Sequence, residues 1–452
     1  MGESKKNSQL ALLGAAHSFN HSLFVIASPL LTLIMASLSV TKTEIGLVSM
    51  IASFIYGAGA LVGGPLGDKI GEAKTISICL AFSGLSTLIM LAAGFTTSIY
   101  VYALALISMA VWASLYHPTA NSLISKSFKG RVSEAMGLHG VGGTLGTVLT
   151  PIVAWFIGAT FGWPWAFVTF GVLSVILALF FVRGYMRVRL ASLFSCFLTF
   201  SLFCYELILY NLFTTITFAW LFAFSFILLL RLEKRTRPAI VRENIDKSSS
   251  GTIIDALKIR ELWILLIFNV AIGLFMKGVE LYFPTYVSDN KLIAFGLTKD
   301  ERGMWASIAY TCVLAVGVPA QWIGGKAADK IGSKKVLIAT STGVCLSLLS
   351  ILLFPFPIVG IALFIVLYGL SFYAHQPALN ALTGFCCPEN QRGAVYGIFF
   401  FTSFGIGSLS QSIAGYVADN YGGLDTSFYM LTAFALAALL LAFKLPKRRE
   451  SE

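Results

Sequence analysis

The segment GGPLGDKIGEAK, residues 63–74, has a second copy later in the chain, GGKAADKIGSKK, residues 324–335. Asp68 and Asp329 are 261 residues apart, and the glycines three positions further on keep the same separation. Self-similarity at a fixed period indicates that one structural unit has been used twice. The sequence therefore predicts two related halves, joined by a central segment that has no counterpart.

Both copies lie between long apolar stretches. Of the 452 residues, 57% are hydrophobic and 12% are charged, and a helix crosses the bilayer core with about 20 apolar residues. Helices of this length satisfy their own backbone groups in lipid. We expect an all-α polytopic membrane protein with 14 spans, or 12 if the central insert does not cross. The predicted spans are residues 10–37, 44–66, 74–94, 98–126, 133–159, 164–183, 190–209, 212–231, 261–286, 304–324, 336–354, 357–385, 394–418 and 426–444.

The central segment decides between these two counts. Its apolar stretch, residues 190–231, is long enough for two crossings, and basic residues flank it on both sides. We interpret it as a hydrophobic hairpin that leaves both flanks on the cytoplasmic side. The expected organisation is a six-helix half at 1–183, a linker with the hairpin and a cytoplasmic segment at 184–259, and a second half at 260–452.

The net charge of +11 reflects orientation in the membrane. Nearly all of the 32 Lys and Arg residues lie at the termini or in one set of alternate loops, as the positive-inside rule describes. The exceptions are Lys42, Lys291, Lys299 and Arg302 in the opposite loops and Lys277 inside a span. We therefore expect cytoplasmic termini and no nucleic-acid partner. The start of the chain runs into the first span without a small-residue cleavage site, so we expect an uncleaved first helix. We also expect a bacterial inner-membrane location.

Several chemistries have no sequence support. The seven cysteines lie in or beside apolar runs without a CxxC pair, which favours small buried hydrophobes over redox or metal ligands. No phosphate-binding loop is present, so transport driven by direct ATP hydrolysis is not expected. We expect no enzyme activity, no cofactor and no metal site.

The first copy of the repeat resembles the signature of the major facilitator superfamily of secondary transporters, G-x-L-x-D-[RK]-x-G-[RK]-[RK]. The resemblance implies two six-helix halves around a small-molecule site, and we expect a monomer in the lipid bilayer. The first copy departs from the signature at Glu72 and Ala73, where the family has basic residues. The matching residues are Gly64, Leu66, Gly67, Asp68, Lys69 and Gly71, and in the second copy Gly325, Asp329, Lys330, Gly332, Lys334 and Lys335.

The motif has a physical reason of its own. Glycines permit a tight turn between helices, and the aspartate can cap a helix or pair with a cation such as Arg131. Such contacts can form in one packing of the halves and break in another. We predict a conformational latch, and the alternative is a turn with interfacial charges. The predicted latch residues are Asp68, Lys69, Arg131, Asp329, Lys330 and Arg392.

Three further stretches resemble the fosmidomycin-resistance branch of the superfamily. They are AAHSFNH at 15–21, YHP at 116–118 and the glycine-rich residues 137–146. Drug antiporters often carry an arginine in the fourth helix, and the span 98–126 has none. Importer and exporter functions therefore both stay open.

Ionisable residues inside spans usually mark function, because each costs roughly 2.5–3.5 kcal/mol at mid-membrane. His17 and His21 are one helical turn apart, and Lys277 and Glu280 share a stripe with Asn269. Both stripes lie on the first helix of their half. All five histidines fall in predicted spans: His17, His21, His117, His139 and His375.

A second pair of helices adds polar groups beside prolines. His117 and Asn121 share a face beside Pro118, and Pro377 lies in the equivalent place. Proline releases a backbone carbonyl and permits a kink, so we predict a bendable polar wall on each side of a central cavity. The alternative is structural bonding between helices. The predicted substrate-binding residues are His17, His21, His117, Asn121, Lys277, Gln376 and Asn380.

We expect a secondary transporter that moves a small organic solute by alternating access and is coupled to protons. Glu280 is the first candidate for the proton carrier, followed by His17, His21 and His117, and Lys277 is placed to hold an anionic group. One alternative is a facilitator or proton symporter that imports a nutrient. Another is a transport-inactive scaffold or receptor.

Overall fold

The computed structural model describes residues 3–128, 132–183, 258–387 and 392–446. The predicted hairpin at 190–231 and most of the linker lie outside these residues, so the choice between 12 and 14 spans stays a prediction. In the part that the structure describes, every regular element is a helix, which confirms the all-α prediction. Eleven stretches of these residues are long and apolar enough to cross a membrane.

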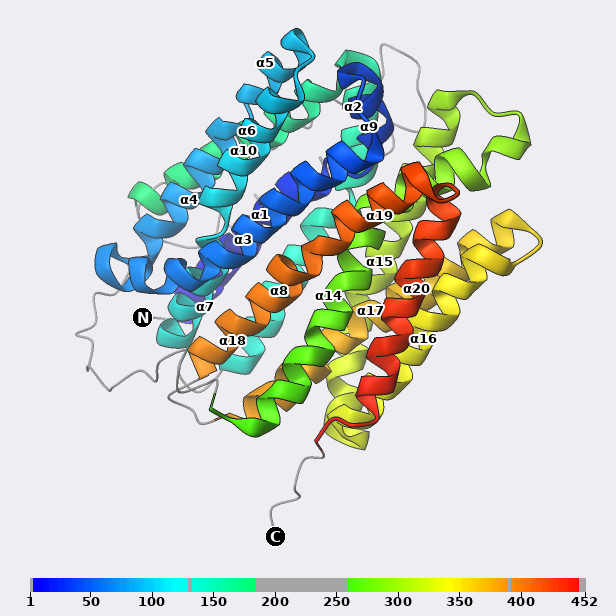
Figure 1. The fold of residues 1–452 in the computed structure, drawn as a ribbon. Coiled ribbons are helices and arrows are strands. Elements are labelled where there is room, and N and C mark those ends of the chain that lie inside the picture. The colour runs from blue at the N-terminus through cyan, green and yellow to red at the C-terminus, as the bar shows by residue number, and fades with distance from the viewer. Residues whose placement is uncertain (1–2, 129–131, 184–257, 388–391, 447–452) are drawn as a thin grey trace.

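The helices before the linker pack mainly against one another (Figure 1). The pairs with the most extensive contacts are α4 with α10, α1 with α8, and α3 with α6. These helices are α1 (Glu3–Val25), α2 (Leu31–Leu38), α3 (Lys42–Ile70), α4 (Glu72–Ser86), α5 (Ile89–Thr96), α6 (Ile99–Ala113), α7 (Tyr116–Ser127), α8 (Val132–Val148), α9 (Thr150–Phe161) and α10 (Trp163–Arg183).

The helices after the linker form a second group around α17, which packs against α15 and α16. The groups meet where α3 lies beside α19 and where α15 lies beside α8 and α9. The second group comprises α14 (Arg260–Tyr286), η1 (Val287–Lys291), η2 (Ile293–Phe295), α15 (Lys299–Ile331), α16 (Ser333–Leu353), α17 (Pro357–Phe385), α18 (Arg392–Phe400), η4 (Phe401–Gly405), η5 (Ile406–Ser408), α19 (Leu409–Asn420) and α20 (Gly423–Ala442).

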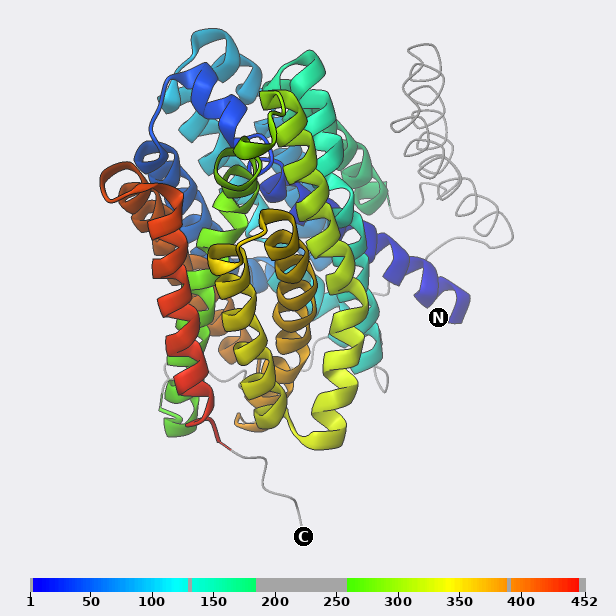
Figure 2. The same ribbon diagram turned by 90° about the vertical axis from the view of Figure 1, so that its right-hand side faces the viewer.

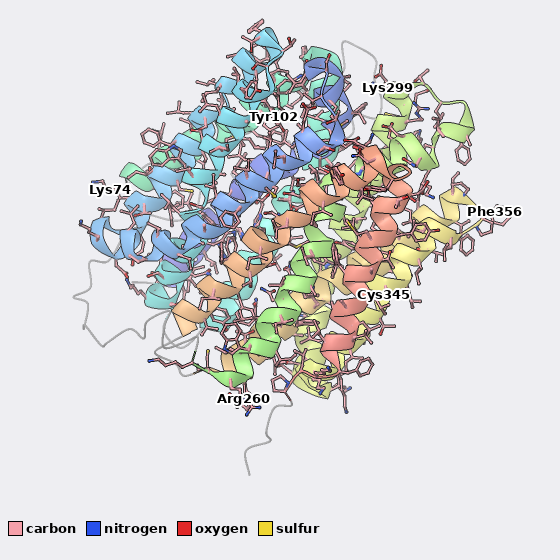
Figure 3. The ribbon with its side chains drawn as sticks, viewed as in Figure 1. Lys74, Tyr102, Arg260, Lys299, Cys345 and Phe356 are labelled. Atoms are coloured by element: carbon pink, nitrogen blue, oxygen red, sulfur yellow. The ribbon has the colours of Figure 1, made fainter. Side chains whose placement is uncertain are left out.

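Two equivalent helices, α3 and α15, begin with the same local device. Each starts with a capping box, in which a threonine and the glutamate three residues later bond each other's backbone N–H: Thr41 with Glu44, and Thr298 with Glu301. The repeated signal fixes where the second helix of each half begins. Lys299, at the start of α15, lies at the opposite end of the bundle from Arg260 at the start of α14 (Figure 3).

The same two helices end at the repeated motif. Gly71 and Gly332 follow them with φ angles of 95° and 89°, a conformation that side chains rarely adopt. Glycine at these positions is therefore required by the tight turn into α4 and α16. The repeat in the sequence corresponds to the same helix–turn–helix corner built twice.

Several predicted spans are interrupted in the structure. The first, 10–37, breaks between α1 and α2 at residues 26–30, and the N-terminal turns of α1 extend beyond the bundle (Figure 2). The fourth breaks between α6 and α7 at Ser114 and Leu115, because Pro118 has no N–H for the carbonyl of Ser114. The equivalent α17 continues through Pro377, so the helix break occurs at one of the two prolines only.

Candidate functional site

Three histidine rings from α1 and α7 form one cluster in the first group of helices. The ring centroids of His17 and His21 are 4.7 Å apart, and His117 lies 4.9 Å from the first and 5.0 Å from the second. His17 is 9% exposed. The sequence expectation that His17 and His21 lie on one face is confirmed by their contact, and α7 brings His117 to the same face.

The fourth histidine of this half supports the cluster from α8. The ring of His139 stacks on His17 at 4.2 Å, and its backbone carbonyl accepts a hydrogen bond from His17 Nδ1 at 2.9 Å. The Tyr116 hydroxyl donates to the carbonyl of Leu13 at 2.6 Å and therefore accepts from His139 Nε2 at 3.0 Å. Gly143 leaves room for His17, because a Cβ at that position would collide with the imidazole.

These bonds determine which nitrogen of His17 is free. Since Nδ1 donates to a carbonyl, Nε2 carries the lone pair of the neutral ring. The Nε2 atoms of His17 and His117 are both buried and have no hydrogen-bond partner among the residues described. Buried polar atoms normally have a partner, so the two free nitrogens mark a place where a ligand can bind.

An ion pair on α14, in which the lysine is buried, is the corresponding feature of the second group of helices. Lys277 Nζ lies 2.6 Å from the carboxylate of Glu280, as their spacing predicts, and Lys277 is only 5% exposed. The ammonium also lies 4.3 Å from the centroid of the Phe404 ring, a favourable cation–π contact. The lysine is therefore held by charge on one side and by an aromatic face on the other.

The ion pair lines a small cavity between the two groups of helices. The cavity has a volume of about 30 Å³, which is enough for water but not for an organic solute. Ser28, in the turn after α1, lines this cavity, and its hydroxyl donates a hydrogen bond to the backbone carbonyl of Glu280. The cavity is therefore lined by residues of both groups of helices. Its lining residues are Phe24, Ala27, Ser28, Ser49, Ala52, Ser53, Leu106, Lys277, Glu280, Leu281 and Gln411.

Aromatic rings connect the histidine cluster with the ion pair. The ring of Phe400 lies 4.9 Å from the ring of His117 and stacks on Phe404 at 4.5 Å. Phe404 in turn makes the cation–π contact with the Lys277 ammonium. Tyr56 packs against both phenylalanines and donates to Asn20 at 2.7 Å. Sequence reasoning missed this wall, because single aromatic residues in apolar spans carry no signal of their own.

The remaining predicted binding residues are more dispersed. Gln376 accepts a 3.5 Å hydrogen bond from Gln321, a residue that sequence reasoning missed and that also bonds Thr144 across the two groups of helices. Asn121 is half-buried on α7, one turn after His117, while Asn380 on α17 is exposed. His375 lies apart from the other histidines and contacts the carbonyl of Phe372.

The predicted latch takes a different form. Asp68 pairs at 2.8 Å with Lys126 of α7, and Glu72, where the signature has a basic residue, pairs with the same lysine at 2.5 Å. This contact joins helices of one half, whereas we expected pairing with Arg131, which lies outside the residues described. Lys69, Asp329 and Lys330 are exposed at helix ends, and Arg392 begins α18.

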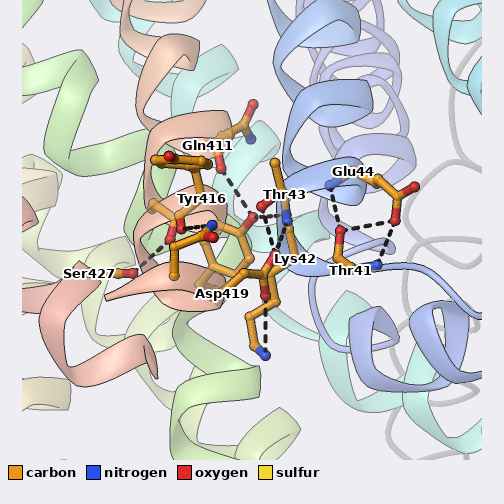
Figure 4. A network of polar contacts seen from close by, with 11 residues as sticks. Thr41, Lys42, Thr43, Glu44, Gln411, Tyr416, Asp419 and Ser427 are labelled. Atoms are coloured by element: carbon orange, nitrogen blue, oxygen red, sulfur yellow. Dashed lines mark hydrogen bonds and ion pairs between the residues drawn. The ribbon is translucent and has the colours of Figure 1, made fainter. Parts of the chain in front are cut away.

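At the opposite end of the bundle, polar contacts join the two groups of helices (Figure 4). The backbone N–H and hydroxyl of Thr43 donate to Asp419 at 2.6 and 2.7 Å, and Lys42 lies 3.9 Å from the same carboxylate. The Tyr282 hydroxyl lies within 3.0 Å of the carbonyls of Lys42 and Gln411. We call this network the Asp419 gate, because it joins the two groups of helices at this end of the bundle.

Two bundles of membrane helices with an ion pair and a small cavity between them define a polytopic membrane protein. The family model described as Major Facilitator Superfamily matches residues 10–412. The chain belongs to this superfamily, as the repeated motif predicts. Membership and structural neighbours place it among membrane transporters rather than enzymes, and its relatives indicate an integral multi-pass protein of a bacterial membrane.

Similar proteins extend the comparison over the whole chain. The fosmidomycin resistance protein of Escherichia coli (strain K12) is 23% identical over 99% of this chain and 96% of its own length. A putative proline/betaine transporter of Staphylococcus haemolyticus (strain JCSC1435) is 30% identical over 36% of this chain and 34% of its own.

Two solved structures share the fold. A mutant of the nucleoside transporter NupG superimposes with a TM-score of 0.70 at 15% identity, covering 96% of this chain and 99% of its own. An inward-facing, unoccupied bacterial homologue of the human lysosomal transporter Spinster gives 0.68 at 13% identity, covering 98% of both chains.

Proposed function

We propose that the protein is a proton-coupled secondary transporter of a small organic anion. The observation that carries the proposal is the pairing of the buried Lys277 with Glu280 on the wall of the cavity between the halves. Ionisable groups in this position are costly in a membrane and usually serve transport. Lys277 holds the anionic group of the substrate, and Glu280 carries the proton.

The Lys277–Glu280 pair couples the binding of the proton to the binding of the anion through charge. With Glu280 ionised, its carboxylate occupies the Lys277 ammonium at 2.6 Å and blocks an external anion. Protonation of Glu280 releases the ammonium, and leaving that charge unpaired in a buried site costs about 3–5 kcal/mol. An anion from solution restores the pairing. Proton and anion therefore bind together, and the loaded and the empty site each stay electrically balanced.

Alternating access follows from the small size of the cavity. The site has no room for an organic molecule until the halves separate, and the Asp419 gate bars one end. Opening that end requires the loss of the Thr43 contacts, while opening the other end leaves the gate intact. We assign residues 1–183 and 260–452 to the two moving halves, with cytoplasmic termini and with the gate on the outer face.

Proteoliposomes that contain a pH dye test the proposal. Phosphonates, carboxylates, sugars and cationic drugs are added in turn, first under a pH gradient and then under a potassium-diffusion potential. A monovalent anion that moves with one proton carries no net charge, so we expect uptake to follow the pH gradient and not the potential. Flux of an anion driven by potential alone, or flux of cations only, contradicts the proposal.

A second candidate is export of a small toxic compound in exchange for protons. It is favoured by the similarity of the whole chain to a fosmidomycin resistance protein. The same vesicles separate the candidates: in symport the lumen acidifies as substrate enters, and in exchange it becomes more alkaline. The absence of any substrate-dependent flux supports the scaffold alternative.

A further inference from the structure

The histidine cluster takes no part in the transport steps above. We propose that His17, His21 and His117 bind one divalent transition-metal ion of the zinc type within the first half. This site lies outside the Lys277–Glu280 pair and is independent of the substrate assigned to that pair. It also departs from our expectation of no metal site, which rested on the cysteines.

The distances fit three metal ligands after a small adjustment. One nitrogen from each of the three rings lies within 4.8 Å of the others. Zinc binds imidazole at about 2.0–2.1 Å in a tetrahedral site, which places its ligand nitrogens roughly 3.3 Å apart. The nitrogens must therefore approach by about 1.5 Å at most. This approach requires the rings of His21 and His117, which are both half-buried, to turn toward a common centre.

The surroundings prepare His17 for this role. Metal-binding histidines commonly donate their other ring N–H to a carbonyl, which fixes the tautomer and orients the ring. His17 makes this bond to the carbonyl of His139, and His139 is itself fixed by stacking and by Tyr116. The free Nε2 of His17 and the free Nε2 of His117 are both buried. A metal ion gives both atoms a partner.

The donor set selects the class of ion. Three neutral imidazoles suit zinc, copper, nickel or cobalt, whereas magnesium and calcium prefer oxygen ligands. The carboxylate at the far end of the aromatic wall, Glu280, is already occupied by Lys277. The fourth coordination position is therefore left for water or a small anion, which also offsets the charge of the ion.

Cobalt(II) titration of the full chain tests the site, because tetrahedral nitrogen coordination of cobalt gives an intense visible absorption. The protein is purified in detergent without a polyhistidine tag, in chloride buffer free of chelators. We expect one cobalt per chain, displaced by zinc and not by magnesium. His117→Ala and His21→Ala should each lower the affinity by more than about 10-fold, whereas His375→Ala, outside the cluster, should leave it unchanged.

Absence of the band in the folded chain overturns the proposal, as does a band that both cluster variants retain at full affinity. If the alanine variants do not fold, the thermal midpoint of the unmodified chain and of His375→Ala decides. A ligand that binds only the native state raises this midpoint. A rise with zinc in both proteins supports the site, and no rise in either overturns it.

Discussion

The first helices of the two halves, α1 and α14, occupy equivalent places but carry different chemistry. Lys277 follows His17 at nearly the same spacing as the 261 residues that separate Asp68 from Asp329. The equivalent position therefore holds an imidazole, His17, in α1 and an ammonium group, Lys277, in α14. The capping boxes and terminal glycines of α3 and α15 are kept in both halves. The scaffold is therefore duplicated, while its polar side chains differ between the halves.

The two sites also differ in how they tolerate change. The ion pair in α14 depends on both partners, since removal of one leaves a buried charge unpaired. The imidazoles in α1 are held by packing and by one hydrogen bond to a carbonyl. Loss of one histidine in α1 therefore costs less electrostatic free energy than loss of one partner of the ion pair in α14. Variants in α1 and α14 should separate metal binding from transport.

Glu280→Gln should have the largest effect. The amide keeps the shape but neither balances Lys277 nor exchanges a proton, so pH-driven uptake should fall to background, and about 3–5 kcal/mol of stability should be lost. Vesicle uptake and thermal unfolding measure the two effects. The matched control is Glu261→Gln, an exposed residue at the start of the same helix. Normal pH-driven uptake by Glu280→Gln would remove Glu280 from the mechanism.

Removing both charges of α14 should undo part of this damage. In Lys277→Met with Glu280→Gln no charge stays buried without a partner, so the double variant should regain about 2–4 kcal/mol relative to Glu280→Gln alone. Transport should stay absent, because the anion has lost its ammonium. A double-mutant cycle on thermal stability measures the coupling. A double variant that is less stable than either single variant would contradict the electrostatic coupling of Lys277 and Glu280.

Much of the fold could be predicted because its signals are local. Long apolar spans and the repeated corner are visible in the sequence, as is the contact between His17 and His21, which depends only on helical spacing. The Lys277–Glu280 pair is predictable for the same reason. Partners on different helices are not. The pairing of Asp68 with Lys126 and the stacking of His139 on His17 depend on how the helices pack.

The helix break before Pro118 could not be predicted from the sequence either. Pro118 and Pro377 each lack an N–H, and the sequence treats them alike. The structure breaks one helix and continues the other through its proline. Surrounding helices therefore decide whether the lost hydrogen bond becomes a break. The contacts of the α8 glycines likewise depend on packing, since Gly142 packs on Gly14 and Gly143 on His17.

Gly143→Ala tests whether α8 positions the His17 ring of α1. The added methyl group collides with His17, so the ring must move, at a cost of about 1–3 kcal/mol. Cobalt affinity should fall with it. Gly137→Ala in the same helix is the control, since a Cβ there meets nothing within 4 Å. Equal cobalt affinity in both variants would show that His17 is not positioned by α8.

Asp419→Asn should have the smallest effect, because it weakens a contact that both halves share. The amide keeps one oxygen for Thr43 but loses the charge, and an exposed contact of this kind contributes about 1 kcal/mol. That is worth roughly a fivefold change between closed and open states. Ser49→Cys reports it, since Ser49 lines the cavity.

An impermeant thiol reagent added to spheroplasts should label the introduced thiol roughly fivefold faster when Asp419→Asn is also present, if the gate faces outward. Glu44→Gln is the matched control, because that carboxylate bonds Thr41 at the start of its own helix. A rate raised equally in both variants means that the start of α3, not the contact between halves, controls access. A rate unchanged in both means that Asp419 does not hold the gate, and the aromatic and glycine contacts between α3 and the η4 segment must close the halves instead.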